Sequence, residues 1–151
     1  MGTREFNLQP ALSYKERLED ICQMALAEIE AAYAREYQVL EMLRELEKLG
    51  YQELERQHVM GKLDMGAINV HFGDLQALQR RIHQQMVVLD DLGQKAESKR
   101  EELIEISKER KALEKLKEKH QKKVAQATVR AENKFMEDIA TAQFLRRRLD
   151  S

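Results

Sequence analysis

The chain has very few residues at which it can turn. Pro10 is its only proline, and three of its six glycines lie close together, between Gly61 and Gly73. A globular core of 151 residues uses proline and glycine turns throughout and more aromatic residues than the 5% found here. The sequence therefore excludes β architectures and parallel α/β folds. Because 35% of the residues are charged, it favours long helices or a coiled coil.

Apolar residues recur in alternating steps of three and four along the first part of the chain. This spacing keeps one narrow stripe on a single helix face, which is the seam of a coiled coil. Pro10 suits a first helical turn, and Ser13 with Glu16 forms a Ser-x-x-Glu capping box. We therefore predict a first helix over about residues 10–58. Its expected seam positions are Leu18, Cys22, Ala25, Ile29, Ala32, Glu36, Val39, Leu43 and Leu46.

A second, longer register follows the glycine cluster and predicts a helix over about residues 73–149, after a turn over about residues 59–72 that has room for a short helical turn near Met65–His71. Beyond Ala131 the steps become four and four, a stutter that locally relaxes a supercoil. The expected fold is all-α, a long antiparallel two-helix coiled coil in which residues 1–151 form a single domain. The second seam comprises Leu75, Leu78, Ile82, Gln85, Leu89, Leu92, Ala96, Lys99, Leu103, Ile106, Arg110, Leu113, Lys117, His120, Val124, Ala127 and Ala131.

The two predicted arms differ in length. If the turn is centred near residue 66, Pro10 faces about residue 122, and the last ~30 residues, roughly 45 Å of helix, have no partner in the chain. This overhang still carries apolar residues at seam spacing. An uncovered apolar stripe predicts contact with another protein. The overhang residues concerned are Val124, Ala127, Ala131, Phe135, Ile139, Ala142, Leu145 and Leu149.

The sequence contains no pattern typical of a catalytic or metal site. A lone cysteine cannot build a disulfide framework and favours a reducing compartment. The four histidines are scattered without ligand spacing, and a thin hairpin has no pocket that would raise the pKa of a carboxyl group. No apolar run approaches the roughly 20 residues of a membrane span, and no signal peptide is evident. We expect a soluble intracellular protein that is not an enzyme and uses no metal or cofactor.

Residues 108–123 hold eight basic and three acidic residues. The favoured interpretation is a solvated helix face that pairs with the acidic first arm, since residues 1–60 carry a balance of −5. Nucleic-acid binding is a weaker alternative because no aromatic residues interleave with the basic ones. Docking on an acidic protein surface is a third.

Three segments, in order, resemble the FliJ family of flagellar export proteins. Residues 6–19 (FNLQPALSYKERLE) resemble the start of that family, residues 109–120 (ERKALEKLKEKH) a later block, and residues 130–140 (RAENKFMEDIA) its closing block. The resemblance covers nearly the whole chain.

The resemblance implies an antiparallel coiled coil similar to the central stalk of rotary ATPases. Such proteins insert into the ring of the flagellar export ATPase, promote its assembly and turnover, bind the export-gate membrane protein, and escort substrate chaperones. By this analogy the chain is a monomer when free and lies in the cytoplasm, at the inner membrane beneath the flagellum, without inserting into it. A homodimeric structural coiled coil and the stalk of a needle-type secretion system are the alternatives. The implied ring contacts are Phe135, Ile139, Arg146 and Arg147, and the implied chaperone or gate contacts are Leu43, Leu46, Tyr51, Phe72 and Leu75.

Overall fold

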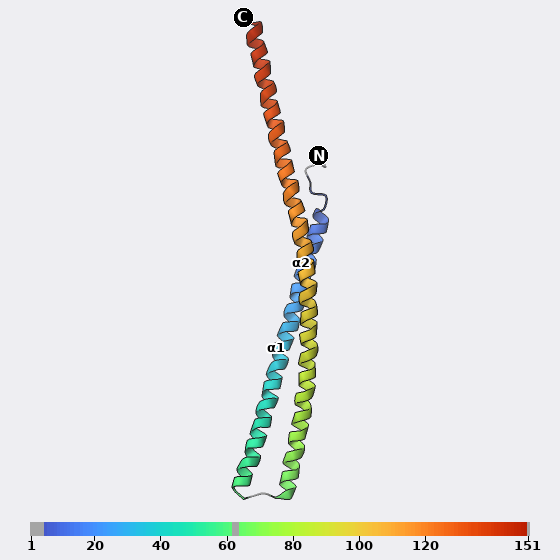
Figure 1. Ribbon diagram of the computed structural model, residues 1–151, viewed down its shortest axis with the longest axis vertical. Helices are drawn as coiled ribbons and strands as arrows, with labels where there is room; N and C mark the ends of the chain where they lie inside the picture. The colour runs from blue at the N-terminus through green and yellow to red at the C-terminus, as the bar shows by residue number, and fades with distance from the viewer. Residues whose placement is uncertain (1–4, 62–63, 151) are drawn as a thin grey trace. The chain divides into compact units, whose positions relative to one another are not determined.

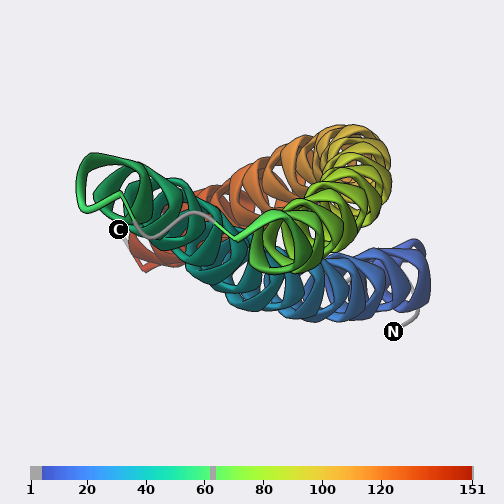
Figure 2. The ribbon, with the colours of Figure 1, turned by 90° about the horizontal axis from the view of Figure 1, so that it is seen from below.

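The computed structural model describes residues 5–61 and 64–150. Helix α1 covers Gln9–Val59 (51 residues), helix α2 covers Met65–Leu149 (85 residues), and the described residues contain no strand. Near their connection the helices lie side by side and antiparallel (Figure 1), and Figure 2 shows the same two ends from below. The fold is the predicted all-α, antiparallel two-helix coiled coil. Its contacts form two units, residues 20–104 and residues 5–19 with 105–150, which we describe separately.

Helix α1 begins at Gln9, four residues before Ser13. The backbone N–H of Gln9 donates a hydrogen bond to the carbonyl oxygen of Phe6 at 3.0 Å. Pro10 lies in the first turn, as predicted, where its missing N–H removes no intrahelical bond. Ser13 lies inside the helix, where its Oγ accepts a hydrogen bond from Gln9 Nε2 at 3.2 Å. The predicted cap formed by Ser13 and Glu16 is therefore wrong, because the chain becomes helical a full turn earlier.

Two short-range signals define the connection between the helices. Gly61 adopts a left-handed conformation (φ 67°), and its N–H donates to the carbonyl of His58 at 3.2 Å, which ends α1 with a glycine cap. Asp64 caps the start of α2: its Oδ1 accepts from the N–H of Gly66 at 3.2 Å, and its carbonyl from the N–H of Ile68 at 2.9 Å.

Helix α2 starts at Met65, eight residues before the expected start at 73. Gly66 and Gly73 both lie within it, although each disfavours a helix by about 1 kcal/mol relative to alanine. The half-buried residues Ala67, Ile68 and His71 continue the seam of α2 through this segment. The burial of this extra seam and the Asp64 cap offset the glycines, so the predicted turn over residues 59–72 is too long.

In the unit of residues 20–104 the side chain of Leu75 fills the space beside Gly50. A Cβ atom placed on Gly50 would lie 2.9 Å from Cδ2 of Leu75, so only glycine fits there without a shift. Gln85 Nε2 crosses the seam and donates to Glu36 Oε2 at 2.6 Å and to the Glu36 carbonyl at 2.8 Å. The buried residues of this unit are Cys22, Leu40, Leu75, Leu89 and Ala96.

The predicted seam of α2 is confirmed from Leu75 to Val124, since every listed position in that range is buried or half-buried. The predicted position Leu43 is half-buried, and the predicted seam of α1 is otherwise confirmed only as far as Glu36. Beyond it, Leu40 is 3% exposed, whereas the expected Val39 is 41% and Leu46 is 50% exposed. The seam takes two four-residue steps in a row, from Ala32 to Glu36 and from Glu36 to Leu40. This shifts the buried stripe around the helix, so Val39 and Leu46 no longer lie on it.

The pairing register also differs from the prediction. Gly50 lies against Leu75, and the ring of Tyr33 lies 3.9 Å from the position of a Cβ on Gly93. Residue n therefore faces about residue 125 − n, not 132 − n, because α2 starts earlier than expected. Consistent with this register in the other unit, the ring of Phe6 contacts that of His120 at a centroid distance of 5.8 Å.

In the unit of residues 5–19 with 105–150, Leu12 is the buried residue, with 1% of its surface exposed. Arg110 bridges Glu19 across the seam and Glu114 on its own helix, and Ser107 Oγ donates to the same Glu19 carboxylate at 3.3 Å. The last half-buried residue of α2 is Val124. Pairing with α1 therefore ends there, within two or three residues of the expected point.

Candidate partner-binding surfaces

Residues 125–149 of α2, which we call the tail, make no helix-to-helix contact in the described structure, and every one of them is exposed. Figure 1 shows the tail, in orange and red, extending beyond the start of α1. It comprises 25 residues, about 37 Å of helix. Its large apolar side chains are open to solvent: Phe135 is 65% exposed and Phe144 is 59% exposed. Exposed apolar surface on this scale is typical of a binding site for another macromolecule.

The tail has two apolar faces, one of which the seam spacing predicts. At about 100° per residue, the predicted stripe that includes Phe135 and Ile139 falls within an arc of about 120° that continues the seam. A second group projects from another side of the helix, because its members follow one another at steps of seven, four and four. It consists of Val129, Met136, Ala140 and Phe144. A partner that buries both groups must contact the tail on more than one side.

The end of the tail is cationic. Arg146, Arg147 and Arg148 occupy the last turn of α2, where positive charge also stabilises the carboxyl end of the helix dipole. All four residues implied as ring contacts therefore lie on the tail. Phe135, Ile139 (39% exposed), Arg146 and Arg147 are all accessible.

The residues implied as chaperone or gate contacts lie in the other unit, and the structure separates them into two kinds. Tyr51 is 47% and Phe72 is 54% exposed, and Tyr51 Oη accepts a hydrogen bond from Gln79 Nε2 at 2.8 Å. Leu46 is also exposed and Leu43 is half-buried. Leu75 is 4% exposed and packs against Gly50, so it supports the helix pair and offers no surface to a partner.

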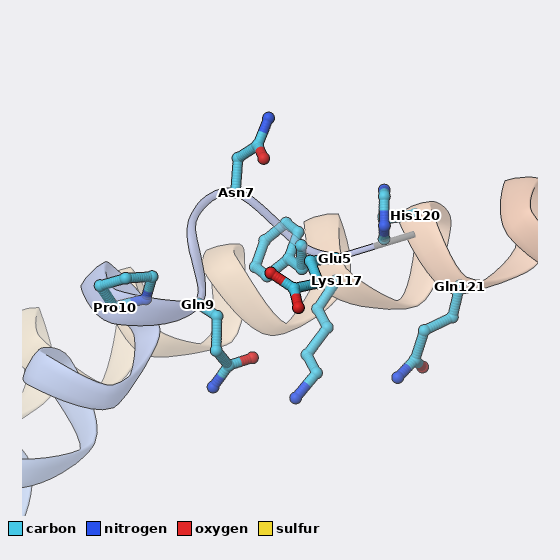
Figure 3. Close-up of a pocket in the computed structure, with 8 residues that line it drawn as sticks. Glu5, Asn7, Gln9, Pro10, Lys117, His120 and Gln121 are labelled. Carbon is cyan, nitrogen blue, oxygen red and sulfur yellow. The ribbon is translucent and has the colours of Figure 1, made fainter. Parts of the chain in front are cut away.

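A shallow pocket forms where the segment before α1 runs along α2 (Figure 3). The segment reaches His120, and Lys117 and Gln121 of α2 border the opening. The tilted contact between the rings of Phe6 and His120, with an angle of 43° between their planes, holds this segment against α2, next to the start of the tail. The pocket thus lies where the packing of α1 on α2 ends.

The shifted pKa values arise from ion pairs on the helix surface. A hydrogen bond from Arg56, reinforced by its charge, lowers the pKa of Glu53. Hydrogen bonds to Glu19 and Glu114 raise the pKa of Arg110. These pairs connect neighbouring turns or the two helices, as expected for stabilising contacts on a coiled coil.

Within residues 5–61 and 64–150, no group of three or more histidine, cysteine, aspartate or glutamate side chains is arranged to hold a metal ion. Neither helix, over its described residues, is long and apolar enough to cross a membrane.

Comparison with known families gives one match. The family model described as "Flagellar FliJ protein" matches residues 4–149, nearly the full length of the chain. Searches of curated proteins and of solved structures returned no match. The family match spans both helices, the connection and the tail, as the resemblance of the three sequence blocks predicts. The chain belongs to the FliJ family and is a component of the flagellar protein export apparatus.

Proposed function

We propose that this protein is the central stalk of the flagellar export ATPase: its tail inserts into the ATPase ring and promotes ring assembly and ATP hydrolysis. The observation that carries the proposal is the tail itself, 25 exposed residues with two apolar faces and no helical neighbour in the described structure. A helix that is apolar on two sides suits an opening that surrounds it better than a single flat surface. The arginines at its end then contact the ring subunits by charge.

The ring contacts in this proposal are Phe135, Ile139, Arg146 and Arg147. The two apolar side chains supply the buried area, because large side chains that become fully covered dominate binding energy. The arginines supply planar groups that bind carboxylates or carbonyl oxygens. The protein contributes no catalytic group to ATP hydrolysis. It acts by biasing the interfaces between ATPase subunits.

We further propose that the helix pair near the connection binds the export gate and the substrate chaperones. Leu46, Tyr51 and Phe72 are the exposed side chains that support this assignment, and Leu43 lies half-buried beside them in sequence. Tyrosine and phenylalanine are frequent anchors of protein interfaces. Leu75 is left out because it is covered by α1.

The proposal places the protein in the cytoplasm at the base of the flagellum, as a monomer in a single coiled-coil domain when free. The monomer is supported by the seam: α2 already covers the seam of α1 within one chain, which leaves no second seam of that length for a homodimer. The family match supports the flagellar system over a needle-type one, since it names the flagellar protein.

Titration of the purified full chain into the export ATPase tests the stalk proposal. We expect the hydrolysis rate and the fraction of assembled rings to rise. The double variant Phe135→Ala/Ile139→Ala should lose most of this stimulation while remaining as helical as the wild type by circular dichroism. The control Met24→Ala/Met42→Ala removes two similarly exposed apolar side chains from α1 and should stimulate normally.

A second pair of variants separates the two proposed surfaces. Tyr51→Ala/Phe72→Ala should reduce binding of the gate and of chaperones in a pull-down while leaving ATPase stimulation unchanged. Deletion of residues 131–151 should abolish ATPase stimulation while leaving binding of the gate and of chaperones unchanged. Full stimulation by the deleted chain would show that the tail does not enter the ring.

A further inference from the structure

Six exposed lysines form a continuous line along α2, which we call the lysine stripe. At about 100° per residue they fall within an arc of about 120°, over roughly 22 Å of helix. This stretch is the yellow to orange part of α2 in Figure 1. The stripe consists of Lys108, Lys111, Lys115, Lys119, Lys122 and Lys123.

The lysine stripe points away from α1. The half-buried residues of the same stretch, such as Arg110, Leu113 and Lys117, face α1 from the opposite side of the helix. The favoured sequence interpretation, a basic face that pairs with the acidic first arm, therefore applies to Arg110 and does not apply to the stripe. The helix geometry leaves the stripe facing outward.

Acidic residues offset part of the positive charge of the lysine stripe, since Glu118 lies one turn from both Lys115 and Lys122. Two of the three acidic residues within residues 108–123 are held in ion pairs outside the stripe: Glu109 with Lys15, and Glu114 with Arg110. Among the six lysines, the only ion pair within the described residues joins Lys108 to Glu105, at 3.5 Å. An exposed row of like charges repels itself, and contact with an anionic surface relieves that repulsion.

The composition of the lysine stripe decides which anionic surface it fits. Binding of single-stranded nucleic acid uses aromatic side chains for stacking, and the stripe contains none. Lysine is also depleted in protein–protein interfaces, where tyrosine, tryptophan and arginine anchor the contact. Six point charges on long flexible stems match a fluid surface whose charges rearrange around them.

From these observations we propose that the lysine stripe binds the surface of a lipid bilayer that contains anionic headgroups, without insertion of the helix. This contact is independent of the proposed stalk function, which uses other residues. A straight row of charges touches a flat surface along its whole length, so all six ammonium groups reach the headgroups together. Each lysine near such a surface contributes about 1 kcal/mol, so removal of one charge weakens binding about fivefold.

Vesicle sedimentation with the full chain tests the proposal. The probes are vesicles of phosphatidylcholine alone and vesicles with 30% phosphatidylglycerol, compared at low and at high salt (30% is a design choice, on the order of an anionic membrane). We expect binding only to the anionic vesicles, with loss of binding as salt rises because the contact is screened. The variant Lys111→Gln/Lys115→Gln/Lys119→Gln should bind about 100-fold more weakly.

The control variant Lys48→Gln/Lys95→Gln/Lys134→Gln removes the same total charge from exposed positions outside the stripe and should keep most of the binding. Equal loss in both variants would overturn the proposal, because net charge alone would then explain the effect. Failure of the wild type to bind anionic vesicles at low salt would also overturn it. Tighter binding of the wild type to duplex DNA or RNA than to anionic vesicles would overturn it too. Loss of ATPase stimulation in the stripe variant, with vesicle binding unchanged, would also overturn it.

Discussion

Two glycines inside the helices of the unit 20–104 have opposite surroundings, and this difference predicts opposite effects of the same substitution. A Cβ on Gly93 would meet Cε2 of Tyr33 at 3.9 Å, an ordinary van der Waals contact. A Cβ on Gly50 would meet Cδ2 of Leu75 at 2.9 Å, which is too close. Leu75 is 4% exposed, so its side chain has little free space into which to move.

The magnitudes follow from these contacts. Alanine is favoured over glycine within a helix by about 1 kcal/mol, and nothing at Gly93 opposes that gain. Gly93→Ala should therefore raise the free energy of unfolding by about 0.5–1 kcal/mol and the melting temperature by about 1–4 °C. At Gly50 the same gain is offset by an overpacking cost of about 1–3 kcal/mol, so Gly50→Ala should be neutral or destabilising by up to about 2 kcal/mol.

Thermal and urea unfolding, followed by circular dichroism of the full chain, measure both effects. The double variant Gly50→Ala/Leu75→Ala provides the internal check, because removal of the leucine side chain also removes the clash. Leu75→Ala should then cost less in the Gly50→Ala background than in the wild type. An equal rise in stability for Gly50→Ala and Gly93→Ala would refute the close approach of the helices at Gly50.

Three further predictions follow from the cross-helix contacts and the tail. Gln85→Leu should destabilise the chain by about 1–3 kcal/mol, because the carboxylate and the backbone carbonyl of Glu36 both lose their donor, Gln85 Nε2. Glu36→Leu/Gln85→Leu should recover most of that loss in urea unfolding, and an additive result would show that the pair is not coupled. Arg56 lowers the pKa of Glu53, so the stabilisation from this pair is complete above the unfolded pKa of Glu53 and is lost as the pH falls through its folded pKa. Amide exchange at the end of α1 should therefore become faster on acidification in the wild type. The change should be smaller in Arg56→Gln. Deletion of residues 131–151 should leave the urea midpoint of the remaining chain within experimental error, since no described contact joins these residues to α1; a clear shift of the midpoint would mean that the tail helps to hold the helix pair together.

The sequence predicted the parts of the fold that depend on repeated spacing. The seam of α2 emerged correctly over some fifty residues because each position contributes to one periodic pattern, so an isolated polar residue such as Gln85 does not hide it. In α1 the same pattern misplaced Val39 and Leu46 after Glu36, although Leu43 is half-buried as predicted. There Val39 and Leu40 are both apolar, and only contact with the partner helix decides which of them is buried.

The connection was predicted less well because single contacts determine it. The glycines at 66 and 73 read as a turn, yet the cap at Asp64 and the half-buried residues after it make that segment helical. Residues 13–16 match the capping-box motif, but they lie inside a helix that begins at Gln9. The motif itself does not depend on whether the preceding residues are already helical. Each of these errors lies within eight residues of a helix end, where local signals compete.

The three-four spacing of the seam predicts one apolar face of the tail and does not predict the other. The second face, which includes Met136 and Phe144, is visible on a helical projection of residues 125–149 when all apolar residues are plotted. The lysine stripe required the structure, because the direction of α1 determines which basic residues pair across the seam. Charge counts along the chain do not distinguish Arg110 from Lys111.

The distribution of large side chains argues that the tail is made for binding. The buried positions of the helix pair hold leucine, cysteine and alanine, with Gly50 in contact with Leu75 and a polar Glu36–Gln85 contact across the seam. Two of the chain's four phenylalanines lie instead in the tail, where they are mostly exposed. If stability of the hairpin alone determined the sequence, these rings would contribute most at the seam, where burial of each would add about 2–3 kcal/mol. In the free chain they contribute little to stability, so their contribution must come when a partner covers them.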